Sequence, residues 1–286
     1  MDMLKWCAGC LAVLALIYAG LAAVGAWRWK VATRNLVAVL DDGQVGGCAA
    51  RFDAGEIAGL PAPVQRYFKQ ALTHGQPIIR TVDLTQSGTF NLSLATAQWR
   101  PFTARQHITT AGPGFVWDAV IQMFPGVPVR VVDAYIAETG RLRPAILGLF
   151  SLGEVQGKGE IARGELMRYF AEAVWYPTAL LPSQGVVWQA VDDTSARATM
   201  TDGAVCLTLL FRFGPDGLVA EVHADARGGM VGKTVVLMPW DCRMSDYRRQ
   251  DGMLVPFVGE VIWQTAQGEK PYFRGRMTRL AYGFGS

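Results

Sequence analysis

Residues 115–123 read FVWDAVIQM, and apolar side chains occupy every second position from Phe115 to Met123. In an extended chain these side chains share one face, while Asp118 and Gln122 point to the other. The alternation therefore predicts a half-buried β-strand. Five further stretches alternate in the same way: 129–137, 205–213, 218–225, 255–265 and 272–282.

Turn residues separate several of these stretches. Asp202-Gly203 and Asp251-Gly252 each stand between two alternating runs, and the sequence GPDG at 214–217 separates another pair. Aspartate followed by glycine suits the backbone angles of tight antiparallel hairpins. About ten antiparallel strands in sequential order are expected, which indicates one meandering sheet.

One longer helix is expected among the strands. Residues 160–174 read EIARGELMRYFAEAV, with Tyr169 and Phe170 on an apolar side, and Pro177 stops the helix shortly afterwards. The other side carries three charged residues at pairing distance, which predicts a solvated face: Glu165, Arg168 and Glu172. A shorter helix is expected at 64–72, opened by Pro61 and Pro63.

The N-terminal part of the chain is of a different kind. Between Lys5 and Arg28 a run of 22 residues has no charged side chain. Such a run is long enough to cross the roughly 30 Å hydrocarbon core of a bilayer as a helix. The bulky, basic residues 27–30, WRWK, argue against removal by signal peptidase, so we expect a retained signal anchor.

Together these patterns predict a mainly β (α+β) fold. A strongly curved antiparallel sheet, or open half-barrel, is expected to wrap around one or two helices after an N-terminal transmembrane helix. The predicted organisation is a membrane anchor with its flanks at 1–34, a linker at 35–59 and the curved β domain at 60–286.

Charge excludes one class of partner. The whole chain has 27 Lys and Arg against 24 Asp and Glu, but residues 35–286 contain 23 of each. A nucleic-acid-binding domain would carry a basic excess, so no nucleic-acid partner is expected. The basic residues Arg28, Lys30 and Arg34 flank the apolar run, and by the positive-inside rule they favour a cytoplasmic domain.

Residue patterns that are typical of catalytic or metal sites are sparse. The three histidines show no metal-ligand spacing, and the five cysteines imply no disulfide framework. Residues 228–234 end in Gly-Lys-Thr like a phosphate loop, but Arg227 stands where that motif requires its first glycine. We therefore expect no metal and no cofactor, assign no catalytic residue, and lean away from an enzyme.

Three segments together resemble an uncharacterised bacterial family of membrane-anchored domains of unknown function: LPAPVQRYF at 60–68, WRPFTA at 99–104 and GELMRYFAEAVWYPTALLP at 164–182. The resemblance runs from about Leu60 to Tyr282 and includes DYR at 246–248, DGM at 251–253 and Pro256. It implies no particular activity.

The last part of the chain, about 80 residues, is also loosely similar to the lipoprotein carriers of the bacterial envelope. Those carriers hold acyl chains in an open, bent antiparallel sheet around helices. This similarity implies a single-pass protein of the inner membrane with its domain on the periplasmic or extracellular side, against the charge rule above.

The predicted function is binding of an apolar or lipid-like ligand between the sheet and the 160–174 helix, without chemistry on the ligand. Burying an acyl chain contributes about 0.8 kcal/mol per methylene, so binding needs no catalytic group. The expected site has an aromatic lining and a polar rim: Trp117, Tyr169, Phe170, Trp175 and Tyr176, with His107 and Glu165 at the rim.

Two alternatives stay open. An enzyme acting on a membrane-derived substrate would use an acid such as Glu165, Glu172 or Asp133 beside Arg168 and His107. A scaffold that recruits a protein partner would instead have a solid core and an exposed apolar patch.

Overall fold

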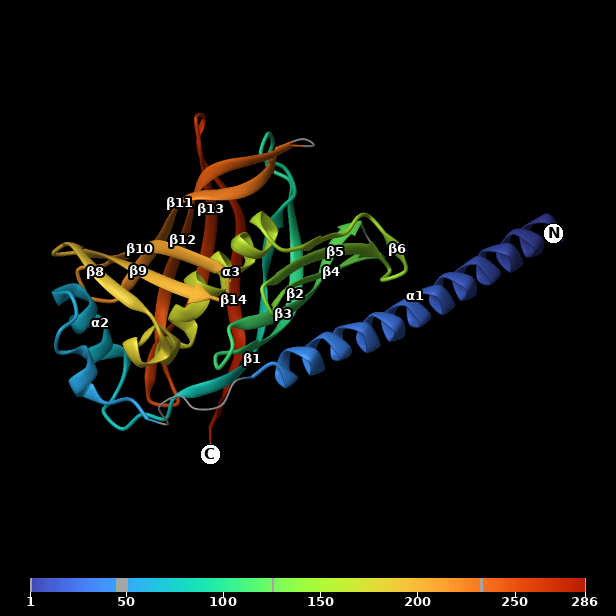
Figure 1. Ribbon diagram of the computed structural model, residues 1–286. Helices are drawn as coiled ribbons and strands as arrows, with labels where there is room; N and C mark the ends of the chain where they lie inside the picture. The colour runs from blue at the N-terminus through green and yellow to red at the C-terminus, as the bar shows by residue number, and fades with distance from the viewer. Residues whose placement is uncertain (1, 45–50, 125, 232–233, 286) are drawn as a thin grey trace.

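The computed structural model describes residues 2–44, 51–124, 126–231 and 234–285 (Figure 1). Its helices are α1 (Asp2–Asp42), α2 (Ala62–Ala71) and α3 (Glu160–Glu172), with short 3-10 helices η1 (Ala54–Ile57), η2 (Ala173–Trp175), η3 (Pro177–Leu180) and η4 (Pro182–Gln184). Its strands are β1 (Ile79–Asn91), β2 (Trp99–Thr109), β3 (Gly114–Phe124), β4 (Val127–Ile136), β5 (Thr139–Ile146), β6 (Phe150–Ser151), β7 (Val155–Gly157), β8 (Val187–Asp192), β9 (Ser195–Asp202), β10 (Val205–Phe213), β11 (Val219–Val231), β12 (Thr234–Gln250), β13 (Met253–Thr265) and β14 (Gly268–Phe284).

The strands of the described residues form one 14-stranded sheet with two halves that each follow the chain. One half runs from β1 outward to β6, with β7 also paired to β5, and the other runs from β14 outward to β8. The first and last strands pair antiparallel, with Val82 opposite Tyr282, and this β1–β14 seam joins the halves. The prediction of a mainly β fold with one large antiparallel sheet is confirmed, and the described sheet does not close on itself.

The Asp-Gly turns lie where the sequence predicted them. Asp202-Gly203 connects β9 to β10, and Asp251-Gly252 connects β12 to β13. The φ angles are 54° at Gly203, 48° at Asp251 and 83° at Gly252. These values lie in the left-handed region, which glycine enters freely and aspartate tolerates. The two turns thus allow the tight hairpins that set strand register.

Helix α3 connects the outer ends of the two halves, because it follows β7 and precedes β8. It contacts β3, β4 and β5 of one half and β10 and β11 of the other. Gly140 of β5 permits α3 to approach the sheet closely, since a Cβ at this position would lie 2.8 Å from the carbonyl carbon of Ile161. The helix predicted at 160–174 is confirmed, and its last residues continue as η2.

The solvated face predicted for α3 is wrong. Glu165 and Glu172 are 5% and 7% exposed, and the side chain of Arg168 is 14% exposed. The helical spacing correctly separated these residues from Tyr169 and Phe170, but strands of both halves of the sheet contact the helix. Neither side of its middle turns therefore faces water.

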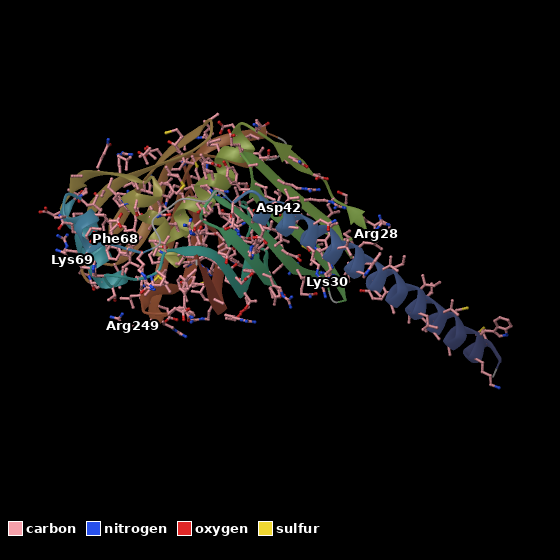
Figure 2. All side chains as sticks on the ribbon, turned by 60° about the horizontal axis from the view of Figure 1, so that its bottom comes forward. Arg28, Lys30, Asp42, Phe68, Lys69 and Arg249 are labelled. Carbon is pink, nitrogen blue, oxygen red and sulfur yellow. The ribbon has the colours of Figure 1, made fainter. Side chains whose placement is uncertain are left out.

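The C-terminal half of α1 packs on the outer face of the sheet, while its N-terminal half projects away from the body (Figure 2). Its buried positions Gly25, Trp29, Thr33 and Leu40 recur at helical spacing. Trp29 and Leu40 pack in a small cluster with apolar residues of β3, β4 and β5. This cluster covers the outer face of strands that the alternation predicted to be half-buried.

Part of the predicted linker at 35–59 contacts the folded body. Residues 35–42 form the last turns of α1, and η1 lies within 51–59. Phe52 and Ile57 are buried in the main hydrophobic core. Residues 45–50, which include Cys48, lie outside the described residues.

Candidate functional site

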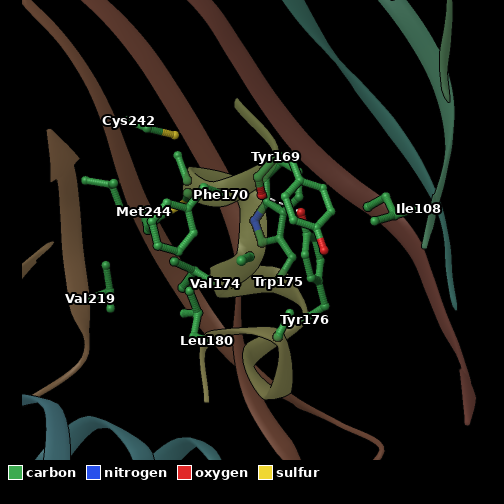
Figure 3. Packing of buried hydrophobic residues seen from close by; sticks show 14 of the residues in the cluster. Ile108, Tyr169, Phe170, Val174, Trp175, Tyr176, Leu180, Val219, Cys242 and Met244 are labelled. Atoms are coloured by element: carbon green, nitrogen blue, oxygen red, sulfur yellow. Dashed lines mark hydrogen bonds between the residues drawn. The ribbon is translucent and has the colours of Figure 1, made fainter. Parts of the chain in front are cut away.

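The side chains predicted as an aromatic lining belong to the main hydrophobic core. They are at most 4% exposed: Trp117, Tyr169, Phe170, Trp175 and Tyr176. Figure 3 shows four of them: Tyr169 and Phe170 of α3, Trp175 of η2, and Tyr176, which follows η2; Met244 lies beside Phe170. The hydroxyl of Tyr176 donates a hydrogen bond to the Tyr169 carbonyl at 2.5 Å. A role for these residues in ligand binding stays a prediction.

Buried polar side chains lie between α3 and the sheet, and we call this group the α3 polar cluster. Its members come from β2, β4, α3 and β11: Gln106, Asp133, Glu165, Arg168, Glu172 and Arg227. The sequence predicted Glu165 at the rim of a ligand site and named Asp133, Glu172 and Arg168 for the enzyme alternative, but it gave Gln106 and Arg227 no role in a site. Their signal was the presence of three charged residues on a helix that is surrounded by strand-forming segments.

Arg168 is at the centre of the α3 polar cluster. Its Nη1 lies 2.6 Å from Asp133 Oδ2, and its Nε lies 2.8 Å from Glu172 Oε1. Gln106 Nε2 donates to the second oxygen of Glu172 at 2.6 Å. The guanidinium also lies 4.9 Å from the ring centre of Phe115, so it stacks on an aromatic face as well as pairing with carboxylates.

Glu165 is less well satisfied than its neighbours. Its Oε1 lies 3.8 Å from Arg227 Nη2, whereas its Oε2 and the Oδ1 of Asp133 are buried without a hydrogen-bond partner among the described residues. Burial raises the pKa of Glu165 to about 8, and the charge of Asp133 adds to the rise, while Arg227 and Arg168 oppose it. We infer that Glu165 holds a proton at neutral pH.

That proton also balances the charges of the α3 polar cluster. Three carboxyl groups, those of Asp133, Glu165 and Glu172, face the two guanidinium groups of Arg168 and Arg227. With one carboxyl protonated, the buried group is neutral overall, which lowers its desolvation cost.

His107 lies away from this cluster. Its Nδ1 is 2.8 Å from Asp83 of β1, and its Nε2 is 2.9 Å from Asp41 at the end of α1. Gln106, the preceding residue, points into the α3 polar cluster, so alternation places His107 on the opposite face of β2. The structure therefore does not bring His107 and Glu165 together as one rim.

The charges around His107 change its acidity. Burial alone would lower its pKa, but hydrogen bonds to Asp83 and Asp41 and their negative charges outweigh burial and raise the pKa. The protonated ring therefore ties the C-terminal end of α1 to the sheet.

The larger of two described cavities is a cleft of about 490 Å³ at the tips of the β1–β2 and β13–β14 hairpins. It is lined by Leu94, Ala95, Met238, Pro239, Gln264, Thr265, Ala266, Gln267 and Lys270. Met238 shares a face of β12 with Trp240, Cys242 and Met244, which are buried in the main core. The cleft thus continues the core-facing surface toward the hairpin tips.

Sequence reasoning missed this cleft. Its available signal was the presence of the apolar residues Leu94, Met238 and Pro239 close to turns, where polar residues are usual. The second cavity, about 150 Å³, includes Tyr169 and Met200 in its lining. Neither cavity is lined by a member of the α3 polar cluster.

Comparisons with known proteins agree with the resemblance in the sequence. No curated protein matches the chain. Among solved structures, a LolA superfamily protein from Nitrosomonas europaea has 8% sequence identity and a TM-score of 0.41, over 80% of this chain and 96% of that chain. The model of the Family of unknown function (DUF6920) matches residues 58–282. Since this match covers most of the sequence, the chain belongs to that family of unknown function.

Proposed function

We propose that the protein is anchored in a membrane through α1 and binds an apolar, lipid-like ligand without reacting with it. The anchor is supported by the apolar part of α1, which is long enough to cross a membrane and is not buried against the rest of the protein. Leu14 and Leu16 are 61% and 73% exposed, and a bilayer would cover such side chains.

Retention of the anchor is supported by the packing that follows it. Trp29 is 3% exposed, and its Nε1 donates to Asp118 Oδ1 at 2.8 Å. The helix therefore continues from the apolar run onto the sheet without an extended segment for a protease. We place the protein in the inner membrane as a single-pass protein, with the β domain on the periplasmic or extracellular side.

The cleft carries the ligand-binding proposal. Its volume of about 490 Å³ lies within the usual range for small-molecule sites, and Leu94, Met238 and Pro239 supply an apolar wall. Beside it, Trp263 and Tyr272 stack with ring centres 5.7 Å apart. An acyl chain placed there would bury methylene groups at about 0.8 kcal/mol each.

Lys270 indicates the chemistry of the ligand's head group. It lines the cleft and lies opposite Trp263 in the β13–β14 register. Within the described residues its ammonium group has no ion pair. A lysine at the edge of an apolar cleft favours an anionic head group, such as a carboxylate or phosphate.

The buried aromatic residues belong to the same proposal as a deeper site. We propose that the sheet curves around α3 and that the helix can separate from one half to admit more of the ligand. Support comes from the contacts of α3 with both halves and from the flexible side chains of Met167, Met200 and Met244 in the core. Trp117, Tyr169, Phe170, Trp175 and Tyr176 would then line the opened space, with Glu165 at its polar end.

An enzyme is the second candidate, and the raised pKa of Glu165 beside Asp133 is the observation that favours it, because a general acid needs a raised pKa. Access argues against this candidate, since the side chains of Glu165 and Asp133 are only 7% and 13% exposed. His107 also lies on the other face of β2 and cannot assist them.

Photo-crosslinking tests the binding proposal. The full chain in phospholipid vesicles is irradiated with a diazirine fatty acid, and the labelled peptides are identified by mass spectrometry. We expect label in 234–240 and 264–270, and at least a fivefold loss in Met238→Trp, which fills the cleft, or Lys270→Glu. Lys69→Glu, at an exposed lysine of α2, is the matched control. Label that is uniform over the surface, or equal in all variants, would refute the proposal.

A further inference from the structure

Two contacts fix the sheet against the apolar part of α1. Gly25 lies against the turn between β5 and β6, where a Cβ would collide with the carbonyl oxygen of Leu147. Seven residues closer to the N-terminus, the hydroxyl of Tyr18 donates a hydrogen bond to the carbonyl of Gly126 in the β3–β4 turn. Both Tyr18 and Gly25 belong to the uncharged run between Lys5 and Arg28.

The positions of these contacts along α1 show how deep the two turns would lie in a membrane that the helix crosses. At 1.5 Å per residue, Gly25 lies about 3 Å and Tyr18 about 14 Å inside the run, counted from Trp27. A tilt of the helix would reduce both depths. Along a membrane-spanning α1, the β5–β6 turn would therefore lie at the edge of the hydrocarbon core, and the β3–β4 turn would lie deeper within it.

The turns carry large apolar side chains that nothing in the described part of the chain covers. Phe124 at the end of β3 is 62% exposed, Phe150 of β6 is 57% exposed and Leu152 is 55% exposed. Arg28 and Lys30 lie on the part of α1 that runs along these strands (Figure 2). Exposed aromatic residues beside basic ones are typical of the membrane interface.

We infer that the β3–β4 and β5–β6 turns enter the bilayer that α1 crosses, with Phe124, Phe150 and Leu152 inserted among the lipids. The inference rests on the proposed membrane anchor, and it is independent of the cleft. The partner that covers Phe124, Phe150 and Leu152 is a phospholipid bilayer, because these side chains are continuous with the apolar surface of α1. The basic flank Arg28 and Lys30 suits anionic head groups.

This arrangement gives the domain a fixed orientation relative to the membrane. A helix alone would leave the domain free to turn about its axis and to tilt. Contacts at two turns beside the helix add two further points, and three points define a plane. The half of the sheet that contains β3 to β6 therefore faces the lipid, and the outer strand β8 lies at the opposite end of the sheet order.

Site-specific fluorescence tests the inference. An environment-sensitive fluorescent amino acid replaces Phe124, Phe150, Leu14 or Val187 in the full chain, one position at a time. The chain is reconstituted in phosphatidylcholine and phosphatidylglycerol vesicles, with and without bromine on the acyl chains. Leu14 reports on the anchor, and Val187 of β8, which is 58% exposed, is the matched control for a surface apolar residue.

We expect brominated lipid to reduce the emission at 14, 124 and 150 at least twofold and to leave 187 unchanged. Quenching at 14 with 124 and 150 as unquenched as 187 would overturn the inference while leaving the anchor intact. Absence of quenching at 14 would overturn the anchor and the inference together. All four side chains are exposed, so the replacements leave the core unaltered.

Discussion

The substitution Glu165→Gln tests whether the buried carboxyl group of Glu165 holds a proton. A glutamine amide can donate to Asp133 as a protonated Glu165 would, but it cannot ionise. The pKa of Glu165 is raised from an ordinary value near 4.5 to about 8, chiefly by burial. Between these values the folded protein keeps a proton that the unfolded chain releases, so its free energy of unfolding falls as pH rises.

The magnitude follows from that difference in bound protons. One extra proton in the folded state changes the free energy of unfolding by about 1.4 kcal/mol per pH unit. From pH 5 to pH 8 wild type should thus lose up to about 4 kcal/mol relative to Glu165→Gln. Below pH 4.5 the two proteins should be similar in stability, and above pH 8 the difference should level off.

Urea unfolding of the full chain in detergent, followed by tryptophan fluorescence at several pH values, measures this difference. Glu154→Gln is the matched control, because Glu154 is exposed and pairs with Arg141 near the sheet edge. Its curve should run parallel to wild type. Parallel curves for Glu165→Gln and wild type would refute the bound proton and leave Glu165 ionised beside Arg227.

Three further predictions concern packing and the α1 contact. Gly25→Leu should detach α1 from the sheet and lower the melting temperature by several degrees, whereas Gly20→Leu, with open space around it, should change neither the melting temperature nor limited proteolysis. His107→Gln should lower the free energy of unfolding by on the order of 1 kcal/mol at pH 6 and by less at pH 8. Asp83 and Asp41 raise the pKa of His107, so their interaction with the ring stabilises the fold at pH values below the ordinary pKa of histidine. This contribution is lost as the pH rises through the pKa of His107 in the folded protein. Equal losses of stability at both pH values would contradict the prediction. Phe170→Ala should cost about 3–5 kcal/mol of unfolding free energy, measured by urea titration, because the ring is fully buried.

Local signals in the sequence were sufficient for the hairpins. Asp251-Gly252 announces a tight turn because few residues tolerate its backbone angles, and the alternation on each side sets the pairing of β12 with β13. Residues 160–174 were predicted as a helix for a similar reason, since their periodicity is local.

Features that depend on distant segments could not be predicted in this way. The burial of Glu165 depends on β4 and β11, which approach α3 from different halves of the sheet. His107 was predicted for a polar rim because it alternates with other polar residues, but α1 covers that face and supplies Asp41. The cleft is formed by two hairpin tips, and no single stretch of sequence encodes it.

The β1–β14 seam determines when the sheet can be completed. Residues 79 and 284 pair across almost the whole length of the domain, so the central contacts are also the most distant in sequence. Such contacts form slowly, because a long loop must close before any of them is made. As the chain leaves the ribosome from its N-terminus, β1 has β2 beside it on one edge and must wait for the last strand on the other. Until that strand arrives, the middle of the sheet exposes an unpaired edge, and the growing chain needs protection from aggregation there.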